Sequence, residues 1–258
     1  MIQRRQFASL LLAAPFATAG CSRAATTQSN PGQSDFSYLP GIAVREPLIA
    51  PQGRRIKVAF AINPGVQVID LAGPWEVFQD TYLPPDAAEP AFELFTVSEA
   101  VQPFRGSGGL MIAPDFSTAD APQPDVIVVP HFDRPRPGTH ETSDIHRWIK
   151  QAHAHAALTM SVCTGAFQLA KTGLLDGVPM TTNQRAYDNF AKSFPAADLR
   201  RGPRFVEAGR IATAGGLSAG IDLAIRVVSR YFGDPVAQET ANIMEYVGTG
   251  WRPASLAS

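Results

Sequence analysis

Residues 157–175 have the sequence ALTMSVCTGAFQLAKTGLL and join two elements of different pattern. The mostly apolar run that ends at Val162 predicts a strand, and the helical spacing of the apolar residues that follow predicts a helix over residues 164–175. Cys163 therefore falls on the turn between a strand and a helix. A strand that passes directly into a helix is the repeating unit of α/β proteins.

The same alternation continues on both sides of this stretch. Residues 125–130, DVIVVP, form a β-branched run that is typical of a strand covered on both faces. The other predicted strands lie at residues 54–62, 91–98, 109–115, 204–209 and 210–215, and the other predicted helices lie at residues 71–80, 143–156, 186–194 and 217–233, with a last helix that begins at Asp234. This order predicts an α/β sandwich with a mostly parallel central sheet and helices on both faces.

Cys163 lies where such a sheet places its chemistry, because ligands bind at the carboxyl ends of parallel strands. The N–H groups at the start of the following helix favour a thiolate and also suit an oxyanion. Thr164 adds a hydroxyl beside the sulfur, and Gly165 lets a ligand approach the backbone closely. The alternative is a small buried cysteine that only fills space. The strand-to-helix turn favours a nucleophile.

Several short motifs resemble those of one family. VCTGA at residues 162–166, with GLLDG at 173–177 and TT at 181–182, is similar to the nucleophile elbow of the ThiJ/PfpI superfamily. DLAGP at residues 70–74 and GLSAGID at 216–222 agree with the same superfamily. The resemblance implies a flavodoxin-like three-layer sandwich of the class I glutamine-amidotransferase type.

The aspartate of DLAGP is similar to the isonitrile hydratase branch of the superfamily and to the ligand-binding halves of AraC-type regulators. In the hydratase branch, the resemblance implies that Cys163 attacks the isonitrile carbon, that Asp70 handles a proton and orients water, and that Thr164 assists. It implies that Gly73 and Gly165 belong to the substrate-binding region. Taken alone, Asp70 also suits the N-terminus of a helix.

Two positions depart from the family pattern. Asn183 stands where many relatives have a histidine, and since an amide cannot accept the proton, amide or peptide hydrolysis is disfavoured. His131 and Phe132 stand where relatives have Gly-Gly. Because these side chains are bulkier, we expect a narrower substrate pocket than in those relatives. His131 either supplies the missing base near Cys163 or has a packing or surface role. We expect Asn183 and His131 at the substrate site. No cofactor and no metal site are predicted, and His146 is expected to be one of several loop and helix-face histidines.

The first residues predict an export signal. Arg4-Arg5 and Phe7 precede an apolar stretch too short to span a bilayer, which resembles a twin-arginine signal over residues 1–20. Ala19-Gly20-Cys21 resembles a lipobox with a lipid on Cys21; the alternative is cleavage after residue 19. The sequence thus predicts a periplasmic protein, or one that a lipid on Cys21 anchors to the bacterial cell envelope. If Cys21 is acylated or lost, Cys163 stays a free thiol.

Residues 21–53 are expected to form a tether with a short ordered part around 36–48, and residues 54–250 the ThiJ/PfpI-like domain. The 258 residues carry a formal net charge of −1, which gives no basis for a nucleic-acid partner. We expect a small-molecule substrate and, from the resemblance, a homodimer. The competing hypotheses are an exported binding or redox-sensing module and a glyoxalase- or deglycase-like enzyme. A DNA-binding regulator is disfavoured, because no helix-turn-helix is expected after the last helix.

Overall fold

The computed structural model describes the chain in four ranges, residues 39–44, 46–85, 87–133 and 143–253. The predicted export signal, the predicted lipid acceptor Cys21 and most of the predicted tether lie outside them. Within the described residues, no helix is both long and apolar enough to cross a membrane.

The core of the protein is one seven-stranded sheet in the order β10-β11-β7-β6-β1-β2-β5. Its strands are parallel except β10, which pairs antiparallel with β11. The strands are β1 (Ile56–Ala61), β2 (Phe92–Ser98), β3 (Phe104–Arg105), β4 (Met111–Ile112), β5 (Phe116–Ser117), β6 (Val126–Val129), β7 (Leu158–Ser161), β8 (Pro179–Met180), β9 (Asp198–Leu199), β10 (Phe205–Ala208) and β11 (Ile211–Ala214). This confirms the predicted flavodoxin-like α/β fold.

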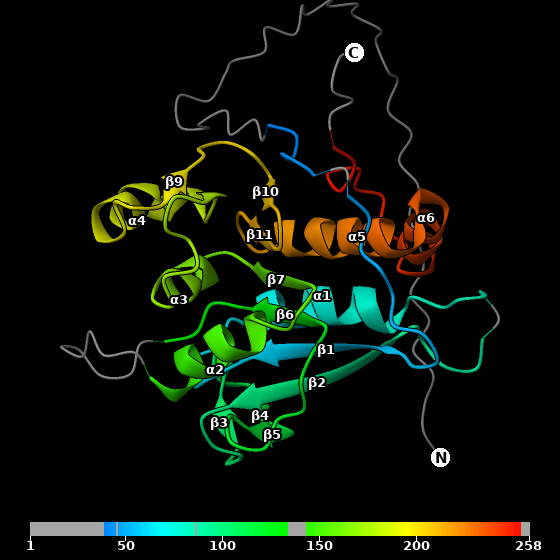
Figure 1. Cartoon of the computed structure of the whole chain (residues 1–258), viewed down its shortest axis with the longest axis horizontal. Helices are drawn as coiled ribbons and strands as arrows, with labels where there is room; N and C mark the ends of the chain where they lie inside the picture. Colours follow the sequence, from blue (N-terminus) through cyan, green and yellow to red (C-terminus); the bar gives the residue numbers. More distant parts are fainter. Residues whose placement is uncertain (1–38, 45, 86, 134–142, 254–258) are drawn as a thin grey trace, which may run out of the picture. The chain divides into compact units, whose positions relative to one another are not determined.

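Helices cover both faces of the sheet (Figure 1). On one face α1 packs against α5, and α6 packs against α5; on the other face α2 and α3 contact each other and the central strand β6. The helices are α1 (Val68–Gln79), α2 (Asp144–His153), α3 (Gly165–Ala170), α4 (Tyr187–Ser193), α5 (Ala219–Phe232) and α6 (Asp234–Ile243), with single 3-10 turns η1 (Ser107–Gly109) and η2 (Gln184–Ala186).

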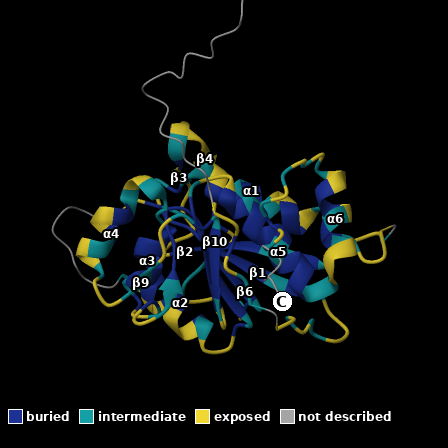
Figure 2. Cartoon of the chain, turned by 90° about the horizontal axis from the view of Figure 1, so that it is seen from above, coloured by how far each residue is buried: buried dark blue, intermediate teal, exposed yellow. Residues whose placement is uncertain are grey.

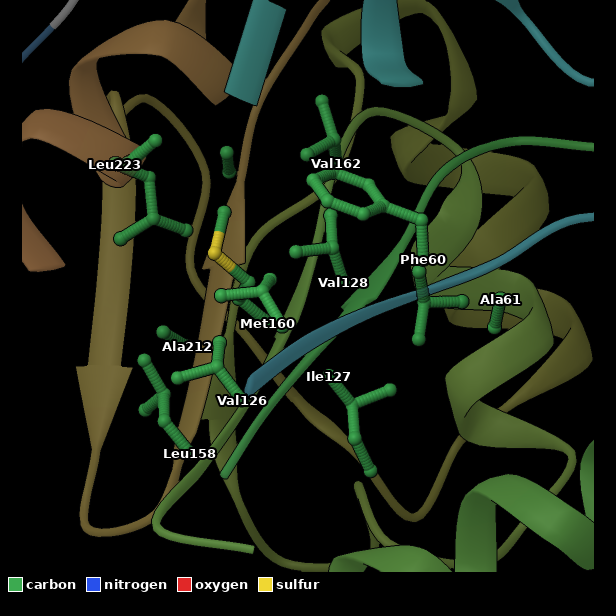
Figure 3. Packing of buried hydrophobic residues seen from close by; sticks show 14 of the residues in the cluster. Phe60, Ala61, Val126, Ile127, Val128, Leu158, Met160, Val162, Ala212 and Leu223 are labelled. Atoms are coloured by element: carbon green, nitrogen blue, oxygen red, sulfur yellow. The ribbon is translucent and has the colours of Figure 1, made fainter. Parts of the chain in front are cut away.

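The central strands are buried along their whole length, as expected for strands covered on both faces. Every residue of β6 is buried, and so is every residue of β7. Figure 2 shows these strands in dark blue, with exposed residues on the loops and outer helix faces. Val128, Met160 and Leu223, which come from β6, β7 and α5, lie together in the packed interior (Figure 3). This packing fixes the carboxyl ends of β6 and β7 side by side.

The helix after Cys163 is shorter than predicted and ends at Ala170 rather than at residue 175. The Thr172 hydroxyl donates to the carbonyl of Leu169 at 2.6 Å, and Gly173 adopts a φ of +78°, which a helix does not continue through. Helical spacing of apolar residues therefore continues past the helix into a turn.

The ordered part of the predicted tether lies along the edge of the sheet. Leu39 and Ile42 form parallel bridges with Pro203 and Val206 beside β10. Gly41 permits this approach, because a Cβ there would lie 2.2 Å from the Phe205 ring. The segment thus covers one edge strand of the sheet.

Candidate active site

Cys163 occupies a sharp turn between β7 and α3. Its φ of +57° lies in the left-handed region, which a residue other than glycine adopts only when its surroundings hold it there. Its N–H donates to the carbonyl of Gly215 at 2.8 Å, and the Thr182 hydroxyl donates to its carbonyl at 2.8 Å. Both backbone groups are therefore fixed from β11 and the loop after β8, and the side chain is 7% exposed.

Gly165 makes this turn possible. A Cβ on Gly165 would lie 2.1 Å from the carbonyl oxygen of Val129 and 2.8 Å from the backbone of Pro130. The first turn of α3 therefore packs directly on the end of β6. The glycine brings the helix close to the neighbouring strand, and the substrate-binding role expected for it stays a prediction.

Asp70 lies in the first turn of α1 and is fully buried. Its Oδ2 accepts a hydrogen bond from the His131 N–H at 3.2 Å, whereas its Oδ1 has no hydrogen-bond partner among the described residues. Burial raises the pKa of Asp70 to about 7, and the His131 N–H and the neighbouring Cys163 side chain oppose part of this rise. The group can therefore both give and take a proton near neutral pH.

Asn183 lies beside the sulfur. Its Nδ2 donates to Cys163 Sγ at 3.3 Å, and its Oδ1 accepts from the Arg185 N–H at 3.0 Å. The second bond sets the orientation of the amide, because it leaves the NH₂ end facing the sulfur. The structure therefore places Asn183 next to Cys163 as a donor.

His131 follows β6 and reaches the site through its backbone. In addition to its N–H on Asp70, its carbonyl accepts the Gln67 N–H at 2.8 Å. The ring is half-buried, and burial lowers its pKa while the charge of Asp133 opposes this. No hydrogen bond joins the ring to Cys163 among the described residues, so a role for His131 as the missing base stays a prediction.

A cavity of about 180 Å³ lies beside Thr164. Its wall combines residues of the loop after β6 with residues of α3, η2 and α4, namely His131, Phe132, Thr164, Phe167, Gln168, Ala186 and Asn189. Gly73 lies elsewhere, in α1, where a Cβ would be 2.9 Å from the Ile221 side chain of α5. Thr164 and His131 thus meet at the cavity, whereas Gly73 permits the packing of two helices.

His146 is buried, whereas the sequence predicts a loop or helix-face histidine. It is not on the outer face of α2 but is 1% exposed, and its Nε2 lies 3.0 Å from Gln168 Oε1. Gln168 in turn donates to the carbonyl of Phe132 at 2.9 Å. Ser143 at the N-cap with His146 three residues later was the signal for a polar residue turned inward at the helix start.

The fold and the site define an α/β protein with a cysteine on a sharp strand-to-helix turn, at the carboxyl ends of parallel strands, beside a buried carboxyl group. Residues 56–230 match the model of the DJ-1/PfpI family. The chain belongs to this family.

Three relatives show how far the likeness extends. An isonitrile hydratase of Pseudomonas putida is 31% identical over 191 residues, which cover 74% of this chain and 78% of the relative. The transcriptional regulator GbdR of Pseudomonas aeruginosa is 29% identical over 142 residues, 54% of this chain and 37% of the regulator. The crystal structure of a ThiJ/PfpI family protein from Pseudomonas syringae superimposes with a TM-score of 0.65 at 23% identity, over 81% of each chain, which supports the fold.

Proposed function

We propose that this protein is a cysteine-dependent enzyme that hydrates a small isonitrile to an N-substituted formamide. One observation carries the proposal: a fully buried carboxyl group with a pKa of about 7 adjoins a cysteine whose sulfur accepts an amide N–H. The likeness to the Pseudomonas putida isonitrile hydratase supports the same chemistry.

The first step joins sulfur to carbon. The Cys163 thiolate attacks the terminal carbon of the isonitrile, and neutral Asp70 gives that carbon a proton, so that a thioimidate forms. Asp70 is then a carboxylate. Its burial without a cation among the described residues makes this charge unstable, which drives it to take up a proton again.

The second step uses water. A water oxygen adds to the same carbon while Asp70 takes up a proton from it. One water proton is passed to the nitrogen and the other stays on Asp70, and the C–S bond breaks with its electron pair returning to sulfur. The products are the formamide, the thiolate and neutral Asp70, so protons and electrons balance without an oxidant. The Asn183 N–H stabilises the leaving thiolate.

The replacement of the family histidine by Asn183 supports hydration over hydrolysis. Amide hydrolysis needs a base that takes the proton of the nucleophile and gives it to the leaving amine, and the Asn183 amide cannot do this. The hydration sequence requires only one group that gives and takes protons, and Asp70 has a suitable pKa.

The test compares Cys163→Ala with the wild-type protein, with an alkyl isonitrile as substrate and the formamide quantified by mass spectrometry. We expect formamide production to fall by at least about a thousandfold, because the nucleophile is lost. Cys21→Ala changes the other cysteine of the chain and serves as the matched control. Unchanged formamide production by Cys163→Ala would contradict the proposal.

A second candidate is a small-molecule binding module, which the match to the regulator GbdR favours. In that case the wild-type protein binds an N-substituted formamide or isonitrile without converting it, and Cys163→Ala binds it equally well. Calorimetric titration beside the formamide assay separates the two functions.

A further inference from the structure

A chain of buried hydrogen bonds includes two residues of the cavity wall, Gln168 and Phe132, and ends at the loop that carries His131. It consists of the 3.0 Å contact between His146 Nε2 and Gln168 Oε1 and the 2.9 Å bond from Gln168 Nε2 to the carbonyl of Phe132. His146, Gln168 and Phe132 are 1%, 2% and 0% exposed. Burial keeps water from competing for these bonds. Gln168 Oε1 has a second donor, Lys171 Nζ at 3.1 Å, whereas the Phe132 carbonyl accepts from the Gln168 amide.

The direction of each bond is determined. The Ser143 N–H donates to His146 Nδ1 at 3.1 Å, so Nδ1 is an acceptor and, in the neutral ring, Nε2 carries the proton. Burial lowers the pKa of His146, which keeps the ring neutral. Nε2 then donates to Gln168 Oε1, and the amide is left with its NH₂ end on Phe132.

Gln168 holds one side of a loop whose other side is held by the start of α1. On that side Gln67 donates to the His131 carbonyl at 2.8 Å, and the His131 N–H donates to Asp70 at 3.2 Å. This N–H opposes the rise that burial causes in the pKa of Asp70. The position of the loop between α1 and α3 therefore decides how well the carboxylate is stabilised.

We propose that Gln168, oriented by His146, is a positioning residue that holds the His131 N–H on Asp70. The inference rests on the proposed hydration, in which Asp70 moves the protons. Without the Gln168 amide, the buried Phe132 carbonyl lacks its donor, and the loop shifts toward another one at the cost of the bond to Asp70.

The ionisable groups around this network are few. Among the described residues, the Cys163 side chain acts on Asp70, and the charge of Asp133 acts on the His131 ring. On His146, the charge of Lys171 adds to the effect of burial and that of Glu99 opposes it. A neutral substitution at Gln168 removes the hydrogen bond that Lys171 Nζ donates to Oε1 at 3.1 Å and leaves the charges of Asp133 and Glu99 unchanged.

The test replaces Gln168 by methionine, which keeps the volume and removes the three side-chain hydrogen bonds, with His146, Lys171 and Phe132. The rate of Cys163 alkylation by iodoacetamide is measured against pH by peptide-resolved mass spectrometry, and Asp70→Asn identifies the inflection that belongs to Asp70. We expect this inflection, about 7 in the wild-type protein, to move upward by about half to one pH unit in Gln168→Met. In the hydration assay kcat falls several-fold and KM changes little.

A matched control removes similar side-chain hydrogen bonds at the amino-terminal end of β6, opposite the end that carries His131. Gln123 Nε2 donates to the carbonyls of Pro124 and Ala152 at 2.9 and 3.0 Å, remote from Asp70. Gln123→Met is expected to lose stability and to keep the wild-type pH profile. A Gln168→Met profile that coincides with that of the wild-type protein would show a purely structural role and overturn the proposal.

His146 provides a rescue experiment that does not depend on Gln168→Met being folded. His146→Gln keeps an N–H near the position of Nε2, whereas His146→Leu does not. We expect the inflection that belongs to Asp70 to move upward in the leucine variant and to stay at the wild-type pH in the glutamine variant. Equal profiles for both variants would count against the role of His146 in orienting Gln168. If the wild-type protein makes no formamide, the hydration proposal fails, and the alkylation profiles still decide this one.

Discussion

Asp70 and Glu207 are both buried carboxylates, but their partners differ. Glu207 is 3% exposed and accepts from Arg230 at 3.1 Å, from Arg226 at 3.2 Å and from the Val44 N–H at 3.1 Å. Two cations and a backbone donor therefore satisfy both oxygens. The same arginines bond to the carbonyls of residues 44 and 46, so the cluster fastens the N-terminal segment to β10 and α5.

Asp70 is 0% exposed and, within the described part of the chain, accepts one backbone hydrogen bond, from the His131 N–H. Among the described residues no arginine or lysine forms an ion pair with it, and burial raises its pKa to about 7. Buried carboxyl groups thus form structural ion pairs when cations accompany them and can carry protons when cations do not. Paired groups of this kind hold the fold together, whereas an unpaired one points to chemistry.

The largest expected effect separates the two groups by activity. Asp70→Asn keeps the size of the side chain and removes its proton transfer, and we expect formamide production to fall by about 10²- to 10⁴-fold. Glu207→Gln is the control, since it lies in the structural cluster. An equal loss of activity per folded molecule in both variants would contradict the distinction between Asp70 as a proton carrier and Glu207 as a structural group.

The next effect is on stability. Glu207→Gln leaves two largely buried arginines, Arg226 and Arg230, without their counter-charge, and we expect unfolding to become easier by about 3–5 kcal/mol. Urea denaturation at pH 8 measures this. If the free energy of unfolding fell by less than about 1 kcal/mol, the ion pairs of Glu207 would contribute little to the stability of the fold.

A pH dependence of stability follows from Asp70. Its pKa is about 7 in the folded protein and 3.8 in the unfolded reference, so the folded state holds more protons between these values, and stability falls as pH rises through this window. Asp70→Asn lacks this loss, and between pH 5 and pH 8 it should gain about 2 kcal/mol relative to wild type. His131 and His146 have lowered pKa values and act in the opposite direction in both proteins, so they cancel in the comparison. Parallel stability curves would contradict the raised pKa of Asp70.

The smallest expected effect concerns the donor on the sulfur. Asn183→Leu removes the N–H that lies 3.3 Å from Cys163 Sγ, and we expect kcat/KM to fall by about tenfold, the value of one hydrogen bond to a charged group. Asn242→Leu, an exposed change on α6, is the control. An unchanged kcat/KM in Asn183→Leu would show that other hydrogen-bond donors stabilise the Cys163 sulfur during the reaction.

Local patterns accounted for most of the fold and for the centre of the site. Continuous apolar strands alternating with helical runs predict the parallel sheet, and the turn after residues 157–162 places Cys163 at its carboxyl edge. The DLAGP motif indicated Asp70. The end of α3 was missed, because apolar spacing says nothing of the hydroxyl and the glycine that end the helix.

The sequence by itself determined the long strands and helices, the strand-to-helix turn at Cys163 and the family, since each is encoded in residues close together along the chain. Only the tertiary structure decided that Asp70 Oδ1 has no hydrogen-bond partner among the described residues, that the Asn183 amide faces sulfur, and that His146 turns inward to Gln168. These contacts join residues of different elements, and burial and hydrogen-bond partners are set by how those elements pack. The pKa of a carboxyl group is therefore a property of the fold, and the residue type alone does not show whether it will bind a cation or carry a proton.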